Sequence, residues 1–150
     1  MRVLIQRVLS ASLWIEGTKY SEIQKGLLVF LGIGQNEQQI DVDWLVNKIC
    51  QLRIFSDEKD QMNLSVQDIN GAILLVSQFT LFASTKKGNR PGFTAAALPS
   101  EANKWYLAFI KALEQASHKE IKTGVFGADM KIELINDGPV TIFIDSKQRE

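Results

Sequence analysis

The sequence predicts one α+β domain over residues 1–150, with a mostly antiparallel, barrel-like sheet and two main helices on one side. Strand-like apolar runs occur near both ends of the chain and in its middle. Two longer segments, 36–52 and 99–117, have apolar side chains at helical spacing. No repeat or linker divides the chain, and 150 residues of which 45% are hydrophobic suffice for a buried core.

The first third of the chain is predicted to be mainly strand. Residues 1–15 alternate apolar and polar side chains, with a break expected at 10–12, and Gly17-Thr18 is typical of a turn. The run 27–33 is continuously apolar, so we expect a central strand that is buried on both faces. Gly32 and Gly34 form a GxG at its end, but the third glycine of a dinucleotide-binding fingerprint is missing.

Each helix has a predicted start and a predicted buried face. Asn36 is the expected N-cap of the first helix, with Gln39 as its capping-box partner. The expected apolar face of this helix comprises Ile40, Trp44, Leu45, Ile49 and Leu52. Pro99 suits the first turn of the second helix. The expected apolar face of the second helix comprises Trp105, Phe109, Ala112, Leu113 and Ala116.

The remaining segments are predicted as loops and strands. The charged run 57–60 lacks the spacing of a calcium loop and is expected to be a solvated turn. Asn70-Gly71 favours a hairpin leading into a core strand over 72–79. Two further strands, 130–135 and 140–145, are expected on either side of a turn or bulge at 136–139, because glycine and proline interrupt a regular ladder there.

Composition excludes several classes of function. Seventeen basic and seventeen acidic residues balance, which argues against a protein that coats DNA or long RNA. The single cysteine, Cys50, allows no internal disulfide and is expected in the core. No basic-then-apolar leader and no apolar run of membrane-spanning length is present, so we expect a cytoplasmic protein without a membrane partner.

The candidate chemistry lies where a buried strand runs into polar residues, at Ser77-Gln78-Phe79-Thr80. The chain has no CxxC pair and no P-loop, and its one histidine, His118, is expected at a helix end. Any reaction must therefore need little from ionisable side chains. Main-chain N–H groups near Thr80 are candidates to hold an oxyanion. Thr80 itself either attacks as a nucleophile, for which no nearby base is visible, or positions water or substrate.

The chain resembles the D-aminoacyl-tRNA deacylases. The resemblance rests on Ser77-Gln78-Phe79-Thr80-Leu81 and on Asn136-Asp137-Gly138-Pro139-Val140-Thr141, which match the two signature segments of that family. Shorter matching stretches lie at 5–8, 26–29, 53–57, 62–64, 90–93 and 126–130, in the same order over nearly the whole chain. The family fold agrees with the predicted one, and its members are homodimers whose sites lie at the subunit interface.

The resemblance implies a role for particular residues. Residues Ser77, Gln78, Phe79 and Thr80 are implied to be catalytic, acting with the 2′-hydroxyl of the substrate. A cis Gly138-Pro139 bond is implied to reach into the partner's site, where two carbonyls reject an L side chain and tolerate a D side chain or glycine. The implied supporting residues are Arg7, Asn136 and Met130. No cofactor or metal is implied.

The basic loop at Lys86, Lys87 and Arg90 has two interpretations. It is either an ordinary charged surface loop or a contact for phosphates near the 3′ end of a tRNA. Arg7 is similarly open to two interpretations, a brace for the Gly138-Pro139 segment or an edge-strand charge.

Two other functions remain possible from the sequence. One is a related editing enzyme that clears other mischarged tRNAs, and the other is a protein that binds RNA ends without catalysis. Ile135 precedes Asn136 where the animal-type relative has threonine, which favours the D-specific enzyme over its relative.

Overall fold

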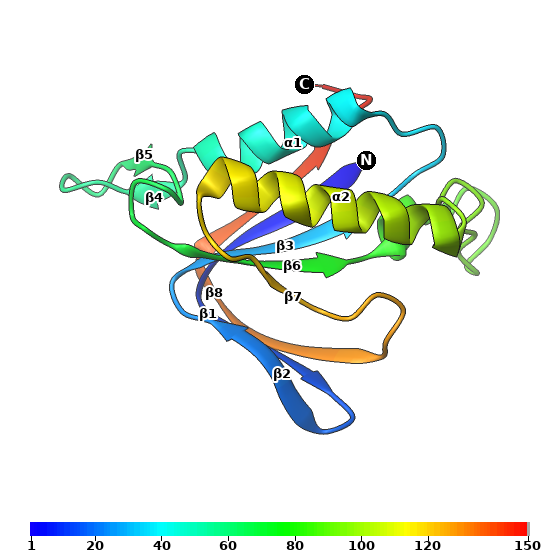
Figure 1. The fold of residues 1–150 in the computed structure, drawn as a ribbon, viewed down its shortest axis with the longest axis horizontal. Helices are drawn as coiled ribbons and strands as arrows, with labels where there is room; N and C mark the ends of the chain where they lie inside the picture. The colour runs from blue at the N-terminus through cyan, green and yellow to red at the C-terminus, as the bar shows by residue number, and fades with distance from the viewer. Residues whose placement is uncertain (150) are drawn as a thin grey trace.

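The computed structural model describes residues 1–149, which form a curved sheet covered on one side by two helices (Figure 1). The helices are α1 (Gln39–Gln51) and α2 (Pro99–Ser117). The main sheet contains β1 (Arg2–Ile15), β2 (Thr18–Ile23), β3 (Gly26–Gly32), β6 (Ala72–Ser77), β7 (Lys122–Thr123) and β8 (Met130–Asp145). A short 3₁₀ helix, η1 (Phe79–Phe82), follows β6. A separate two-stranded sheet consists of β4 (Phe55–Ser56) and β5 (Met62–Leu64).

The main sheet is mixed: most of its pairing is antiparallel, as expected, but two pairings are parallel, which the sequence did not predict. Its order is β2-β1-β3-β6-β7, with β8 on the other side of β1. The three pairings made by β1 are antiparallel, whereas β3 with β6 and β6 with β7 are parallel. Each parallel pair is joined by a crossover through a helix, α1 in the first case and α2 in the second, and such a crossover returns the chain in the same direction.

The hairpin predicted at Asn70-Gly71 does not form, because the strand that follows it, β6, pairs in parallel with β3 and β7. Asn70 has the positive φ of 55° that favoured the hairpin, and the Gly71 N–H donates to the Val66 carbonyl over 2.8 Å. The turn, however, closes a short loop after β5 and sends the chain into β6, which pairs in parallel with β3. The expected core strand ends at Ser77, and the chain then turns into η1.

Strands β1 and β8 run side by side along their whole lengths. The expected break in β1 at 10–12 is absent, and the irregularities in its pairing with β8 lie between Gln6 and Ser10 instead. The two expected C-terminal strands form one 16-residue strand. Gln6 pairs with Thr141 and Val8 pairs with Asn136, so an advance of two residues along β1 corresponds to five residues along β8. The segment 137–139 is therefore a bulge within a strand, as glycine and proline there permit.

The core lies on both sides of β3 and β6, as expected for the apolar run 27–33. On the helical side, Val29 and Leu75 pack with Leu45 and Phe109 from the helices. On the other side, buried residues of β1, β3 and β6 pack with inward-facing residues of β8, which curls beneath the sheet (Figure 1). The members of this second cluster include Val8, Leu13, Leu28, Leu74 and Val76.

The helices agree with the predicted ranges but not with every predicted contact. Helix α1 is capped by Gln38, whose capping-box partner is Asp41, so Asn36 and Gln39 do not have the expected roles. Asn36 lies two residues before this N-cap and has a left-handed φ of 58°. Ile40 in α1 and Ala116 in α2 are exposed rather than buried. Cys50 is buried as expected, and burial raises the pKa of its thiol.

Two further sequence predictions concern loops and membranes. Residues 57–60 form the expected solvated turn, in which Asp57 accepts hydrogen bonds from the main-chain N–H groups of Lys59 and Gln61. Neither helix of residues 1–149 is long and apolar enough to cross a bilayer.

Candidate active site

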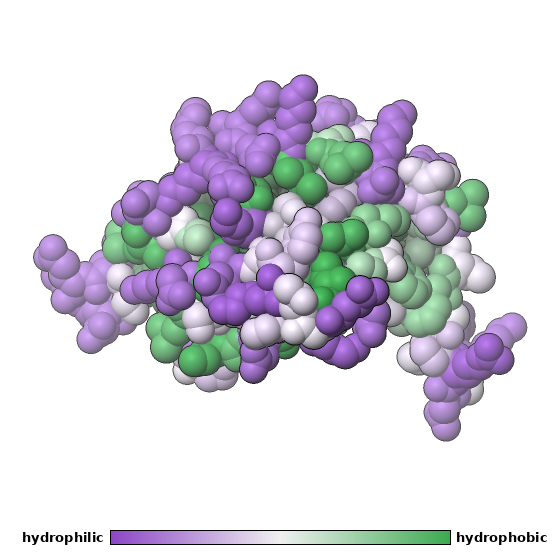
Figure 2. Space-filling view, turned by 60° about the horizontal axis from the view of Figure 1, so that its bottom comes forward, coloured by the Kyte–Doolittle hydropathy of each residue, from purple (hydrophilic) through white to green (hydrophobic). Residues whose placement is uncertain are grey.

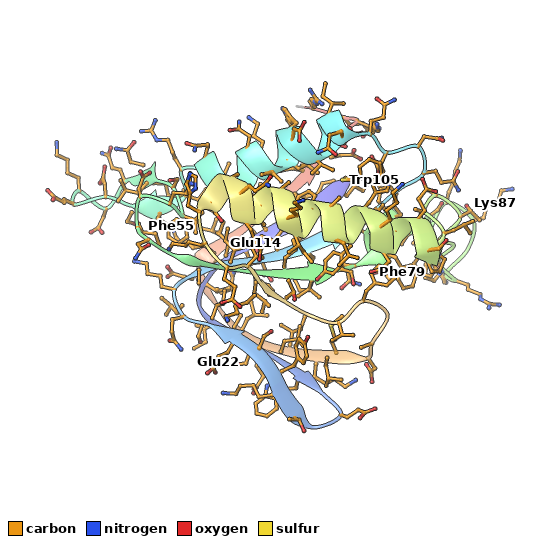
Figure 3. The ribbon with its side chains drawn as sticks, viewed as in Figure 1. Glu22, Phe55, Phe79, Lys87, Trp105 and Glu114 are labelled. Atoms are coloured by element: carbon orange, nitrogen blue, oxygen red, sulfur yellow. The ribbon has the colours of Figure 1, made fainter. Side chains whose placement is uncertain are left out.

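A cavity of about 690 Å³ opens where β6 ends, beside the start of α2 and the chain that leads into β8. Its wall is mainly apolar, with the rings of Phe79, Phe93 and Phe126 and several alanines. The remaining lining residues include Gln35, Ser77, Gln78, Thr94, Asp129, Met130 and Ile132. Figure 3 shows Phe79 at this end of the molecule, near the N-terminal turn of α2.

Three of the four predicted catalytic residues, Ser77, Gln78 and Phe79, line this cavity. The buried strand β6 ends at Ser77, and the Gln78 N–H donates to the Leu31 carbonyl over 2.8 Å, which extends the pairing with β3 by one bond. The chain then turns sharply through η1. Thr80 is exposed beside the cavity without lining it.

The Thr80 hydroxyl is bound to a neutral partner rather than a base. The side-chain amide of Gln78 donates to Thr80 Oγ1. Asp129 is the one carboxylate that lines the cavity in the described part of the chain; it is exposed and pairs with Lys131 over 2.8 Å. A hydroxyl nucleophile needs a base within hydrogen-bond reach, so this arrangement favours positioning by Thr80 over attack by it.

The basic loop is attached to the rim of the cavity. Phe79 is 57% exposed, and its ring meets Phe93 edge to face at 5.0 Å between centroids. Just before Phe93, Gly92 pairs with Ser84 through two main-chain hydrogen bonds and closes the loop at its base. The side chains of Lys86, Lys87 and Arg90 are exposed on this loop, and Lys87 extends away from the body of the molecule in Figure 3.

Met130 is part of the opposite wall. It begins β8 and lies against Gly124, where an added Cβ would stand 2.4 Å from the Met130 sulfur. Near this wall, Tyr106 of α2 is buried and donates to the Leu75 carbonyl over 2.9 Å. Burial raises the pKa of Tyr106 to about 12, so its hydroxyl stays a donor at neutral pH. The helix is thereby tied to the strand that leads into the site.

The Gly138-Pro139 segment does not line the cavity of its own chain. Its peptide bond is cis, and both residues are exposed at the bulge of β8. Two side chains hold the bulge at its base: the Asn136 amide donates to the Val140 carbonyl over 3.0 Å, and Arg7 Nε lies 3.2 Å from the Asp137 carboxylate. The structure thus places Arg7, Asn136 and the bulge together, but apart from Ser77, Gln78 and Met130.

Arg7 is a brace and not an edge-strand charge. It is only 9% exposed, and its guanidinium donates to the main-chain carbonyls of Ile54 and Asp137. Gly138 has a φ of 122°, and an added Cβ would stand 2.6 Å from Arg7 Nη2. Glycine is therefore required at 138 both by the backbone and by the arginine beside it.

Metal ligands and the single histidine are the other candidates for a functional site. Within residues 1–149, no three histidine, cysteine or acidic side chains are grouped as metal ligands. His118 lies at the C-terminal end of α2 with a left-handed φ of 55°, as its predicted place at a helix end implies.

Sequence reasoning missed much of the cavity wall. Residues 94–99 carry no polar pattern that indicates a site, because apart from Thr94 their lining residues are the apolar Ala96, Ala97, Leu98 and Pro99. Phe93 and Phe126 fall in two of the stretches that match the family, and this was the available signal for them.

Comparisons with known proteins indicate one family. A family model described as "D-Tyr-tRNA(Tyr) deacylase" matches residues 4–145. Proteins called "D-aminoacyl-tRNA deacylase" from Flavobacterium johnsoniae and Cytophaga hutchinsonii are 59% and 57% identical over 150 residues, covering 100% of each chain.

Two solved structures share the fold. One, described as "c-Myc DNA Unwinding Element Binding Protein", is 39% identical with a TM-score of 0.91 and covers 97% of this chain and 98% of its own. The other, a probable eukaryotic D-amino acid tRNA deacylase, has a TM-score of 0.81 over 95% of this chain and 97% of its own; at 16% identity it supports the fold alone. The family match and the full-length relatives together show that this chain belongs to the D-Tyr-tRNA(Tyr) deacylase family.

Proposed function

We propose that this protein hydrolyses the ester bond of D-aminoacyl-tRNA and releases the free D-amino acid and tRNA. The observation that carries the proposal is the cavity at the end of β6, which combines apolar walls with the polar turn Ser77-Gln78-Thr80 in a chain whose relatives are named for this reaction. The aromatic and alanine wall suits the flat terminal adenosine of a tRNA, and the polar turn suits the ester that it carries.

The reaction needs little from side chains. Water attacks the ester carbonyl carbon, the bond to the ribose oxygen breaks, and the neighbouring 2′-hydroxyl of the substrate relays the proton to the leaving oxygen. We assign the main-chain N–H groups at the start of η1 as donors to the oxyanion, because the first donors of a helical turn have no partner within it. Gln78 and Thr80 then position the water or the ester, in keeping with their mutual hydrogen bond.

Chirality is checked by the bulge of a second copy of the chain. The bulge is exposed and lies away from the cavity of its own chain, so it can act at a cavity only on another protomer. Carbonyls of the Gly138-Pro139 segment would collide with an L side chain, whereas a D side chain would point away. Glycine has no side chain to collide, so glycyl-tRNA is also expected to be hydrolysed.

The basic loop contributes the contact with tRNA. Its base is attached to Phe79 at the rim of the cavity through Phe93. Lys86, Lys87 and Arg90 are therefore placed to meet phosphates when the 3′ end enters the cavity, a contact that orients the RNA without reading its sequence. With a net charge of zero, DNA is not expected as a partner.

The first test is ester turnover by the purified protein. D-tyrosyl-tRNA and L-tyrosyl-tRNA would be incubated separately with the protein, and the released amino acid would be followed over time. The proposal expects fast release from the D ester and none above the spontaneous rate from the L ester. A glycyl-tRNA sample, expected to be hydrolysed at a rate between these two, completes the series.

Each alternative has a distinct outcome in this assay. Binding of tRNA without release of either amino acid would leave a protein that binds RNA ends and would exclude the hydrolase. Release from both tyrosyl esters would keep the esterase but remove chiral selection from the Gly138-Pro139 bulge. Release from the L ester alone would favour an editing enzyme for other mischarged tRNAs.

A further inference from the structure

The GxG at the end of β3 is in contact with the turn that carries the candidate catalytic residues. A Cβ added to Gly32 would stand 3.0 Å from the Leu81 Cβ, 3.1 Å from the Gln78 carbonyl oxygen and 3.2 Å from a ring carbon of Phe82. All three atoms belong to η1 or to the residue before it. A Cβ added to Gly34 would stand 2.7 Å from the ring of Phe82. The two glycines therefore let the turn lie directly on the strand end.

Arg2, which is paired with Gly32 between β1 and β3, contacts the same turn. Its Nη1 donates to the Leu81 carbonyl over 2.9 Å, and its guanidinium carbon lies 4.5 Å from the centre of the Phe82 ring. Its Nε is fixed by the Asp145 carboxylate at 2.8 Å. Burial alone would raise the pKa of Asp145, but the hydrogen bond and charge of Arg2 and the Lys147 N–H lower it, so the carboxylate remains charged at neutral pH.

These contacts matter because none of the four residues of η1 is buried. The turn is bonded internally by the Leu81 N–H to the Gln78 carbonyl over 3.3 Å and by the Ala83 N–H to the Thr80 carbonyl over 3.0 Å. Apart from Gly32, Gly34 and Arg2, it is held by the Gln78 N–H bond to Leu31 and by the Phe79 ring against Phe93. A single 3₁₀ turn of this kind is weakly stable alone. Its position relative to the cavity is therefore set by what lies beneath and beside it.

We propose that Gly32, Gly34 and Arg2 are positioning residues, which form a seat that holds the Gln78–Thr80 turn in register with the cavity. None of the three lines the cavity at Ser77 to Phe79, so they act through the turn and not on the substrate. The inference rests on the proposed function only in taking this turn as catalytic. It also explains the GxG, which lacks the third glycine of a dinucleotide-binding fingerprint, by the close packing of the turn against these two glycines.

The direct test is Gly32→Ala, with Gly71→Ala as the matched control. Both glycines have a backbone conformation open to alanine, and an added Cβ would meet its neighbours at 3.0 Å in each case. Gly71 lies at the other end of β6, against Ile69 and Val66. The two variants thus introduce a methyl group at the same closest distance in different places, and the free energy of unfolding of each would be measured beside its rate so that loss of stability is accounted for.

The expected result is a loss of kcat at unchanged KM. Gly32→Ala must displace the turn by a few tenths of an ångström, which predicts about a tenfold lower single-turnover rate with D-tyrosyl-tRNA. Gly71→Ala is expected to keep the rate within about twofold. Equal rates for Gly32→Ala and the unmodified protein would overturn the proposal, as would equal losses in the two variants.

Arg2 variants test the other half of the seat. Arg2→Met removes the bond to Leu81 and predicts about a tenfold lower kcat, while Arg2→Lys, whose ammonium donates to the same carbonyl, is expected to recover part of it. The losses from Gly32→Ala and Gln78→Ala should not add, because both act on one turn. Full additivity, or equal activity of the methionine and lysine variants, would count against the seat.

A measurement that needs no activity keeps this inference separate from the proposed reaction. Backbone amide chemical shifts of residues 78–82 are expected to change in Gly32→Ala and in Arg2→Met, and to stay unchanged in Gly71→Ala. If the unmodified protein releases no amino acid, the proposed function fails while these shifts still report on the seat. Unchanged shifts at Gln78 and Thr80 would exclude the seat even in an active enzyme.

Discussion

Arg7 shows how much one side chain can decide in this molecule. An arginine in the middle of a first strand is compatible with a solvent-facing charge, yet here it is almost fully buried. Its guanidinium joins three segments, because it lies in β1, donates to the Ile54 carbonyl before β4 and binds Asp137 in the bulge. Arginine suits this place because its planar fork offers several donors in fixed directions.

Replacement of Arg7 should cost both stability and chiral selection. Arg7→Met leaves the Ile54 carbonyl and the Asp137 carboxylate without their donor, so we expect the free energy of unfolding to fall by about 2–3 kcal/mol. Urea denaturation monitored by circular dichroism would measure the loss. The same variant should release more L-tyrosine from L-tyrosyl-tRNA, because the bulge is no longer held.

Asp137→Asn is the companion variant. It removes only the charge, and the guanidinium still has the two main-chain carbonyls. Because the Asp137 carboxylate is one-third exposed, its loss should cost less than about 1 kcal/mol. A cost equal to that of Arg7→Met would show that the ion pair, and not the carbonyls, holds the bulge.

At the scale of elements, the start of α1 is held by a carboxylate that also binds the C-terminal segment. Asp41 is 1% exposed, accepts from the Gln38 N–H and pairs with Lys147 over 2.6 Å. Burial alone would raise the pKa of Asp41, but hydrogen bonds from Lys147, Gln38 and Ser146 outweigh burial and lower the pKa below its usual value of 3.8. The helix is thereby fastened to the chain beyond β8.

This lowered pKa predicts how stability depends on pH. The carboxylate of the folded protein binds a proton less readily than that of the unfolded chain, so its contribution is complete above about pH 4 and is lost as the pH falls through the folded pKa. Asp41→Asn should therefore lower the free energy of unfolding at pH 7, and the difference from the unmodified protein should shrink toward pH 2. Urea titrations at several pH values would show it.

Asp43 on the same helix supplies the control. It is exposed, and its hydrogen bond comes from Gln39 one turn earlier. Asp43→Asn should change the free energy of unfolding by less than about 0.5 kcal/mol at each pH. A difference for Asp41→Asn that stays constant from pH 7 to pH 2 would show that the lost cap geometry, and not the charge, is responsible.

At the scale of the whole molecule, β8 is an open edge. In the part of the chain that the structure describes, β8 pairs with β1 along one side and with no strand along the other. Sixteen residues of unpaired edge, with Ile135 and Phe143 exposed, are unusual in a lone protomer. Apolar surface also reaches the exterior in several places on the face shown in Figure 2. These features support the proposed association of two copies.

A mixed dimer would test whether the bulge acts across subunits. One protomer would carry Gln78→Ala, which disables its cavity, and the other Gly138→Ala, which disturbs its bulge because the added Cβ meets Arg7. Differently tagged chains would be co-expressed and the heterodimer purified. If the bulge acts in the partner's cavity, the one intact cavity meets the one intact bulge, and the heterodimer releases D-tyrosine but not L-tyrosine.

The homodimers are the controls for this experiment. The Gly138→Ala homodimer should release both enantiomers, and the Gln78→Ala homodimer neither. Release of L-tyrosine by the heterodimer at about half the rate of the Gly138→Ala homodimer would instead show that each bulge serves its own chain. A chain that stays monomeric at the assay concentration would exclude the cross-subunit arrangement altogether.

Local sequence patterns were sufficient to locate the main elements and the polar turn at the end of β6. The 3.6-residue periodicity located both helices and the continuous apolar run 27–33 located the buried central strand, because these patterns reflect which faces of an element avoid water. The change from apolar to polar residues at Ser77 located the polar turn, since a strand that leaves the core must end in groups that tolerate solvent. The resemblance to the deacylases rested on the same residues and is confirmed by the family match.

How these pieces meet depends on contacts between segments that are far apart in the sequence. Parallel pairing of β6 depends on the helix crossovers, which no local pattern encodes, so Asn70-Gly71 suggested a hairpin that does not form. The bulge at 137–139 became part of one strand because β1 continues alongside it, over a separation of some 130 residues. The cavity wall at 94–99 and the seat of η1 consist of residues whose role comes from what lies against them. Such contacts between distant segments leave no periodic mark on either segment, and they appear only when the chain is folded.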